Sequence, residues 1–184
     1  MSYTSQSLSF SENKITYIDT NIDVEWEVMM DWEDPLMSAS AAYICEGGGD
    51  ILEIGFGMGI SANYIQQHTI NSHTIIENHP DIIPKAQTWA ADKPNVTIIE
   101  GDWYNVKDTL SKYDGLFMDT YGDENMGQFA SVLPSLMKEG GKSTWWNGIP
   151  SSSNWYGIEN VTYEEYDVNP PQNSYYNHNK YYLP

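Results

Sequence analysis

Basic side chains are scarce in this sequence. Eight Lys and Arg residues stand against 26 Asp and Glu residues in a chain of 184, which gives a formal net charge of −18 at pH 7. Proteins that bind DNA or RNA draw much of their affinity from Lys and Arg on phosphates, and anionic membrane surfaces recruit the same side chains. The composition therefore excludes nucleic acid and membrane surfaces as default partners and favours a neutral or cationic small partner. Most of the acidic residues are expected to form solvated surface.

Cysteine and long apolar runs are also missing. Cys45 is the single cysteine, so no internal disulfide can form, and the polar segment Met1–Ser9 lacks the basic and apolar regions of a secretion signal. No apolar run approaches the roughly 18 residues that a membrane span needs. The four histidines show no metal-ligand spacing. We therefore expect a cytoplasmic protein without a bound metal, and the sequence carries no signal for an oligomeric state.

Apolar and aromatic residues are plentiful enough for one folded domain, which we predict to span residues 1–184. In residues 50–147 short apolar runs recur, each followed by helix-like spacing. This pattern is typical of an α/β fold with a mostly parallel twisted sheet and helices on both faces. The five predicted strands are Ile51–Gly55, His73–Glu77, Val96–Glu100, Gly115–Asp119 and Lys142–Trp146. The first three are unbroken apolar runs, which predicts burial on both faces.

The segments on either side of this core predict smaller additions. Residues 1–49 indicate an N-terminal lid, made of a β-hairpin within Ser7–Asp19 and a helix broken at Asp34-Pro35, with Asp34 as the N-cap. In residues 148–184 two Tyr-rich runs, Val161–Val168 and Tyr175–Leu183, predict an antiparallel hairpin. Within the core, helices are expected to begin near Gly59, Pro80, Tyr104 and Glu124, and a helix stop with a turn is expected at Gly140-Gly141.

A glycine-rich turn directly after the first core strand is the most informative segment. Gly55, Gly57 and Gly59 let the backbone turn sharply and approach a ligand, and the following helix N-terminus offers free N–H groups. A dinucleotide fingerprint would have glycine at position 60, so Ile60 disfavours a nicotinamide-dependent enzyme. Glu77 ends the second strand, where a carboxylate can accept both hydroxyls of a ribose. The pattern therefore predicts a nucleoside ligand without a pyrophosphate.

Several segments together resemble class I S-adenosylmethionine-dependent methyltransferases, which have a Rossmann-like methyltransferase fold. More narrowly, they resemble the group that contains guanidinoacetate N-methyltransferase and the fungal-type protein arginine Nδ-methyltransferase, with the arginine enzyme the closer by motif detail. The most specific features are a Trp-Glu-x-Pro segment upstream of the glycine turn and an Asp-Thr-Tyr strand end. The matching segments are Val28–Met37, Ile51–Ser61, His73–Asp81, Val96–Trp103, Tyr113–Tyr121 and Trp146–Ile149. The family usually has a helix after the fifth strand, so the short Gly148–Gly157 segment predicts an abbreviated C-terminal region.

The resemblance implies S-adenosyl-L-methionine as the cofactor and assigns residues to it. By this comparison the glycine turn wraps the methionine part, Glu77 holds the ribose, and Asn78 and His79 line the adenine. Asp102 and Trp103 would cover the other adenine edge. The acid on the first strand and two methionines of the lid are also expected to contact the cofactor. The full set of expected cofactor residues is Met29, Met37, Glu53, Gly55, Phe56, Gly57, Met58, Gly59, Ile60, Ser61, Glu77, Asn78, His79, Asp102, Trp103 and Asp119.

The acceptor implied by the resemblance carries a guanidino group, either as a small molecule or as an arginine in a protein. A guanidinium has a pKa of about 12.5–13.8 and must approach a second cation, the sulfonium. Carboxylates beside the two cations would offset their repulsion, since one ion pair at about 4 Å is worth on the order of 4 kcal/mol at an effective dielectric constant of about 20. Asp119 and Glu33 are the predicted catalytic carboxylates. Tyr121 and Asn147 are further expected substrate contacts. A catalytically silent module that binds the cofactor or its product is the alternative.

Overall fold

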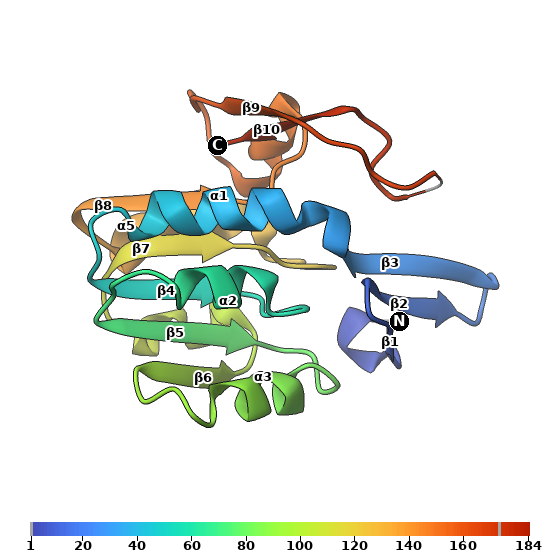
Figure 1. The fold of residues 1–184 in the computed structure, drawn as a ribbon, viewed down its shortest axis with the longest axis horizontal. Coiled ribbons are helices and arrows are strands. Elements are labelled where there is room, and N and C mark those ends of the chain that lie inside the picture. Colours follow the sequence, from blue (N-terminus) through green and yellow to red (C-terminus); the bar gives the residue numbers. More distant parts are fainter. Residues whose placement is uncertain (1, 173) are drawn as a thin grey trace.

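Five parallel strands form the central sheet of the computed structural model, which describes residues 2–172 and 174–184 (Figure 1). The strand order is β6-β5-β4-β7-β8. The bounds are β4 Asp50–Ile54, β5 Ser72–Glu77, β6 Val96–Glu100, β7 Tyr113–Met118 and β8 Met137–Trp145. All five predicted strands are thereby confirmed. The chain runs outward from β4 to β6 on one side and continues with β7 and β8 on the other, and ligands bind at the carboxyl ends of strands where the order reverses in this way.

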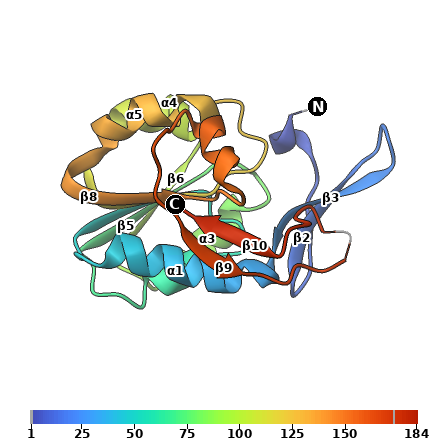
Figure 2. The same ribbon diagram turned by 90° about the horizontal axis from the view of Figure 1, so that it is seen from above.

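Helices cover both faces of this sheet. Figure 2 shows α1 and α3 on one side and α4 and α5 on the other, and α2 lies on the α1 side. The helices are α1 Asp34–Cys45, α2 Ile60–Ile65, α3 Ile83–Ala90, α4 Trp103–Val106 and α5 Phe129–Leu136. Buried Ile51 and Phe117 pack under α1, whereas Leu116 packs under α5. The two-sided burial predicted for the first three strands holds for β4 and β5 but is wrong for β6, because β6 is an edge strand with exposed Thr97 and Glu100.

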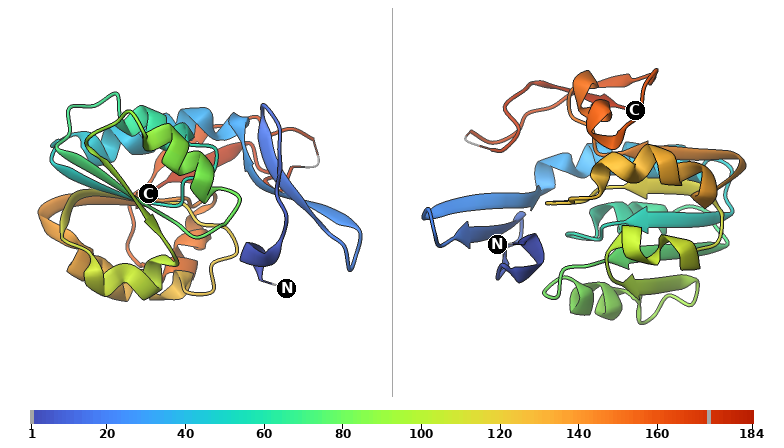
Figure 3. Two further views of the ribbon diagram at one scale, coloured as in Figure 1. Left: turned by 90° about the horizontal axis from the view of Figure 1, so that it is seen from below. Right: turned by 180° about the vertical axis from the view of Figure 1, so that it is seen from behind.

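A small antiparallel sheet stands beyond the carboxyl ends of the central strands (Figure 3). It consists of β1 Ser9–Phe10, β2 Lys14–Asp19 and β3 Val24–Met30, and it follows a 3-10 turn, η1 Tyr3–Ser5. The predicted hairpin is confirmed, but the first part of the predicted broken helix is wrong, because residues 24–30 pair with β2 as a strand. A second 3-10 turn, η2 Asp31–Glu33, then leads into α1. Glu33 rather than Asp34 is the N-cap of α1, and a proline lies in the first turn of α1.

The C-terminal region adds an antiparallel hairpin, as predicted, from β9 Glu164–Asp167 and β10 Lys180–Leu183. Buried Tyr181 and Leu183 of β10 pack against Leu36 of α1. A 3-10 helix, η5 Pro150–Tyr156, fills the short connection after β8. Two further 3-10 turns are η3 Lys107–Thr109 and η4 Met126–Gln128.

Two helix boundaries differ from the sequence-based expectation. The predicted stop and turn at Gly140-Gly141 is wrong, because α5 ends at Leu136 and β8 begins with the next residue and carries both glycines. The helix expected near Pro80 is α3, which begins at Ile83, so Pro80 precedes the helix and Pro84 lies in its first turn. Within the described residues no helix is both long and apolar enough to cross a lipid bilayer.

Candidate active site

The glycine turn after β4 has the sharp backbone that its sequence predicts. Gly55, Gly57 and Gly59 have φ angles of 94°, 53° and 74°, in the left-handed region that favours glycine. A Cβ atom on Gly57 would lie 2.5 Å from the Sδ atom of Met29, and one on Gly55 would collide with the carbonyl oxygen of Asp119. The Met58 N–H also donates to Met29 Sδ over 3.2 Å. The turn is therefore held between the lid strand β3 and the end of β7.

A cleft opens beside this turn at the carboxyl edge of the sheet. Among the residues expected to contact a cofactor, those that line it are Met29, Gly55, Phe56, Gly57, Ser61, Glu77, Asn78, Trp103 and Asp119. Tyr3 also lines this cleft and was not anticipated from the sequence. Its ring lies between His79, at 4.7 Å between ring centroids, and Tyr121, at 5.0 Å. This inner cleft has a volume of about 50 Å³ and adjoins an outer cavity of about 710 Å³, which Asp102 lines. The residues that line both are Tyr3, Asn78, Gly101, Tyr121 and Asp123.

Glu77 presents a fixed carboxylate to the inner cleft. Its Oε2 atom accepts the Phe56 N–H at 2.9 Å, and its Oε1 atom accepts the N–H groups of Asn78 and His79 at 2.8 Å each. A carboxylate has about four acceptor positions. Three are used by the backbone, so about one remains for a ligand hydroxyl.

The other residues expected at the cofactor lie behind the cleft wall rather than on it. They are Met37, Glu53, Met58, Gly59, Ile60 and His79. Glu53 is buried and accepts hydrogen bonds from the Ser61 hydroxyl and from His73 Nε2, the latter at 2.9 Å. It therefore orients Ser61, which does line the cleft. Met37 is packed in the core cluster under α1.

A second cavity, of about 410 Å³, adjoins the first at the end of β7. Four residues line both: Val28, Asp119, Thr120 and Tyr121. Among the described residues none donates a hydrogen bond to the Asp119 carboxylate. Burial raises the pKa of Asp119 well above its ordinary value, and the charges of Glu33, Glu53 and Glu77 raise it further. Within the described residues, Asp119 is thus a carboxyl group without a paired cation or hydrogen-bond donor, at the junction of two cavities.

Glu33 faces the second cavity from the start of α1. Its side chain is buried, with Oε1 accepting the Met30 N–H at 3.0 Å and Oε2 accepting the indole Nε1–H of Trp146 at 2.7 Å. Burial raises the pKa of Glu33, while hydrogen bonds from Tyr175, Met30 and Trp146 act in the opposite direction. The fold therefore brings together the two acids that the sequence singled out, although 86 positions separate them along the chain.

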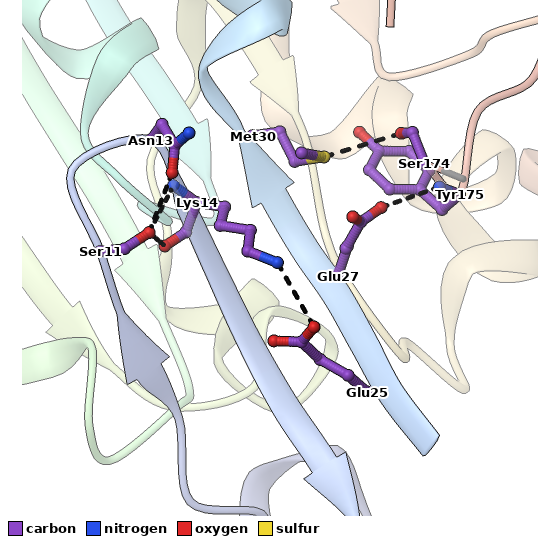
Figure 4. A network of polar contacts seen from close by, with 8 residues as sticks. All are labelled: Ser11, Asn13, Lys14, Glu25, Glu27, Met30, Ser174 and Tyr175. Carbon is purple, nitrogen blue, oxygen red and sulfur yellow. Dashed lines mark hydrogen bonds and ion pairs between the residues drawn. The ribbon is translucent and has the colours of Figure 1, made fainter. Parts of the chain in front are cut away.

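Aromatic residues from the C-terminal region form much of the wall of this second cavity. Tyr175 and Tyr176 line it together with Trp146. Figure 4 shows how this wall is attached to the lid: the Tyr175 N–H donates to Glu27 Oε2 at 2.9 Å, and the Ser174 hydroxyl contacts Met30 Sδ at 3.6 Å. The sequence left the composition of this wall open.

Tyr121 and Asn147, the other expected substrate contacts, also line the second cavity. Asn147 is fully buried, and its amide is engaged within the protein. Its Nδ2 atom donates to the carbonyl groups of Ile149 and Tyr182, and its Oδ1 atom accepts from the Ser153 hydroxyl at 2.7 Å. Its side chain therefore braces η5 and β10 behind the cavity surface. In the described part of the chain, no three His, Cys, Asp or Glu residues are grouped to hold a metal ion.

Curated relatives with matching sequences carry the name protein arginine N-methyltransferase 2. The relative from Kluyveromyces lactis is 36% identical over 134 residues, which cover 66% of this chain and 33% of the relative. The relative from Saccharomyces cerevisiae is 30% identical over 193 residues, with 85% and 46% covered, and that from Yarrowia lipolytica is 29% identical, with 92% and 39% covered. The chain therefore spans between a third and a half of the length of these relatives.

Solved structures share the fold at low sequence identity. Precorrin 8W decarboxylase from Methanobacterium thermoautotrophicum superposes with a TM-score of 0.62 at 15% identity, covering 80% of this chain and 87% of that one. TYW2 from M. jannaschii, solved in complex with AdoMet, gives 0.59 at 12% identity and covers 97% and 83%. The family model for guanidinoacetate N-methyltransferase matches residues 6–147, a range that contains the glycine turn, Glu33, Glu77 and Asp119. The chain therefore belongs to the guanidinoacetate N-methyltransferase family.

Proposed function

We propose that this chain transfers a methyl group from S-adenosyl-L-methionine to a guanidino nitrogen. The observation that carries the proposal is the position of Asp119, an acid without a cationic partner between two adjoining cavities, with Glu33 facing one of them. Asp119 is half-buried, and a carboxylate that has lost much of its contact with water is normally paired, because an isolated charge away from water is strongly unfavourable. Two cationic ligands, a sulfonium on one side and a guanidinium on the other, would supply the missing positive charge.

The cleft beside the glycine turn fits the cofactor. Gly55 and Gly57 let the turn lie directly against Asp119 and Met29, Glu77 has an acceptor position for a ribose hydroxyl, and Trp103 offers a buried aromatic face. When bound, S-adenosyl-L-methionine would supply a methyl carbon made electrophilic by the adjacent sulfonium. Because Tyr3 lines both the inner cleft and the outer cavity, we expect its ring to shift when a nucleoside extends from one into the other.

Glu33 and Asp119 would bind and orient the acceptor. A planar guanidinium can donate to two carboxylates at once, which fixes the plane of the group. Alignment of this kind accounts for much of the acceleration available to a displacement reaction, up to roughly 7–11 kcal/mol. The raised pKa values of both acids suit them to accept the proton that the guanidino nitrogen loses as its new bond forms.

Incubation with labelled S-adenosyl-L-methionine tests this function. The acceptors are guanidinoacetate, free arginine, arginine peptides and basic proteins. All eight Lys and Arg residues of the chain are lysines, so labelled arginine can only come from the added acceptor. We expect transfer to at least one guanidino acceptor, and a loss of about 10²–10⁴-fold in kcat for Asp119→Asn. Asp108→Asn, which removes an exposed carboxylate, is the control.

Two outcomes would count against the proposal. Tight cofactor binding without transfer to any acceptor would identify a silent binding module. Equal turnover by Asp119→Asn and Asp108→Asn would remove Asp119 from the chemistry.

A further inference from the structure

We propose that the second cavity selects guanidino acceptors by the charge at their far end, favouring a second positive charge and rejecting a carboxylate. This inference rests on the proposed function. The lining of the cavity contains three carboxylates, Glu27, Glu33 and Asp119, and neither lysine nor arginine. A guanidinium held by Glu33 and Asp119 leaves Glu27 as an additional negative charge on the lid.

Glu27 differs from the nearby Glu25 in whether a cationic side chain compensates its charge. The Lys14 ammonium lies 3.4 Å from Glu25 Oε2. Glu27 has no lysine within ion-pair distance in the described residues, and its polar partner is the backbone N–H of Tyr175 (Figure 4). A backbone N–H satisfies one acceptor position but does not neutralise the charge. Glu27 therefore keeps its attraction for a cation at the position where β3 meets the C-terminal wall.

An acceptor carboxylate would find no such partner in this cavity. The amide of Asn147 is engaged by Ile149, Tyr182 and Ser153. The one lining side chain that can become cationic is His178, whose ring lies 5.3 Å from the ring of Tyr176. With Glu33 and Asp119 bound to the guanidinium, Glu27 would repel an anionic group at the far end of the acceptor, by an amount that increases where water is excluded.

The remaining lining suits an alkyl chain that ends in an ammonium group. Trp26 and Trp155 are 43% and 62% exposed and line the cavity together with Tyr175, which is 42% exposed. Methylene groups can pack on these rings, and an ammonium group over the face of such a ring is attracted by its π electrons. The class of acceptor assigned to the cavity is therefore an alkylguanidine with a second, terminal cation.

Three acceptors of one length test this selection: butylguanidine, 4-aminobutylguanidine and 5-guanidinopentanoate. They share the guanidino group and four methylenes or their equivalent, and their far ends are neutral, cationic and anionic. We expect kcat/KM to fall in the order cationic, neutral, anionic, with at least a tenfold difference between the first and last at low salt. The difference should shrink as salt is added, because ions screen accessible charges.

The variants Glu27→Gln and Glu25→Gln form a matched pair two residues apart on β3. We expect Glu27→Gln to lower the ratio of kcat/KM for the aminobutyl over the butyl acceptor by about threefold to tenfold, and Glu25→Gln to leave the ratio unchanged. Faster turnover of 5-guanidinopentanoate, or equal ratios in both variants, would overturn the selection by charge while leaving guanidino methylation in place. Turnover of none of the three, nor of any other guanidino acceptor, would instead remove the proposed function.

Discussion

The indole Nε1–H of Trp146 donates a 2.7 Å hydrogen bond to Glu33 Oε2 across 113 positions of sequence. Glu33 stands at the entry to α1, and Trp146 follows the last residue of β8. The bond orients one oxygen of a buried acid and opposes the rise in its pKa. The geometry of the second cavity therefore depends on the lid and the central sheet being correctly placed relative to each other.

Replacing Trp146 by Phe should weaken binding of the guanidino acceptor without abolishing it. The variant keeps an aromatic ring but removes the N–H donor, and hydrogen bonds to charged groups contribute about 1.5–3 kcal/mol. We expect KM for the guanidino acceptor to rise by about tenfold or more and the acidic limb of the pH–rate profile to move to higher pH. Trp145→Phe is the control, because the buried Nε1 atom of Trp145 has no hydrogen-bond partner. Similar kinetics for both variants would mean that packing, not the bond to Glu33, is responsible.

Asn in place of Asp119 should stabilise the ligand-free protein at neutral pH. Because the pKa of Asp119 is raised in the folded state, the folded protein binds more protons than the unfolded chain between the ordinary carboxylate pKa and the raised value. Stability therefore falls as pH rises through that window. We expect Asp119→Asn to raise Tm at about pH 7.5, by roughly 2–4 °C for each kcal/mol relieved, and to raise it little near pH 4. A gain of equal size at both pH values would show that ionisation is not its source.

Alanine at position 57 should reduce cofactor binding. Its Cβ atom would lie 2.5 Å from Met29 Sδ, so the turn or the lid has to move. We expect the Kd for S-adenosyl-L-methionine, measured by calorimetry, to increase by at least tenfold. Gly140→Ala is the matched control: its φ of 76° imposes a similar backbone penalty, but nothing lies within 4 Å of the added carbon. If both variants bind the cofactor as the wild type does, the turn does not form the binding site.

Gln in place of Glu77 should also weaken cofactor binding. The change removes the negative charge that meets a ribose hydroxyl and one acceptor for the backbone N–H groups of the turn. Loss of a charged hydrogen bond of about 1.5–3 kcal/mol corresponds to about a 10–100-fold increase in Kd. Glu100→Gln is the control, since Glu100 stands opposite Glu77 in the β5–β6 register and is exposed. An equal effect of the two changes would argue against a specific role for Glu77.

Removing the ring of Tyr3 should speed cofactor association. The ring lies against His79 and Tyr121, and Tyr3 lines both the inner cleft and the outer cavity. We expect Tyr3→Ala to increase the association rate constant, followed by stopped-flow fluorescence of the tryptophans, by severalfold. An unchanged rate would show that Tyr3 does not obstruct entry.

The parts of the site that depend on neighbouring residues in the chain were predictable from the sequence. Glu77 ends one short apolar strand and Asp119 directly follows another, and the turn at Gly55 is marked by its glycines, so these positions could be assigned. The lid strand was predicted wrongly, because residues 24–30 were assigned to the first part of a broken helix. The alternation of Val24, Trp26 and Val28 with glutamates was the signal for a strand.

The contributions of Tyr3 and Tyr175 could not be predicted in the same way. Tyr175 meets Glu27 across 148 positions, and Tyr3 meets Tyr121 across the cleft. Neither has a local pattern that indicates its partner, because contacts at this range are set by how the lid and the C-terminal hairpin pack on the sheet. The expected cofactor contacts Met37 and Glu53 lie behind the surface for the same reason: sequence spacing identified the elements but not the depth of each side chain.

The two cavities are lined by different parts of the chain, which has a consequence for the order in which they form during synthesis. All residues that line the inner cofactor cleft lie between Tyr3 and Asp123, whereas the adjoining cavity also requires Trp146, Tyr156 and residues up to His178. During synthesis from the amino end, every residue that lines the inner cleft is therefore added before Trp146, Tyr156 or Tyr175. The second cavity gains its aromatic wall, and the hydrogen bond that joins Tyr175 to Glu27, only after these later residues have been added.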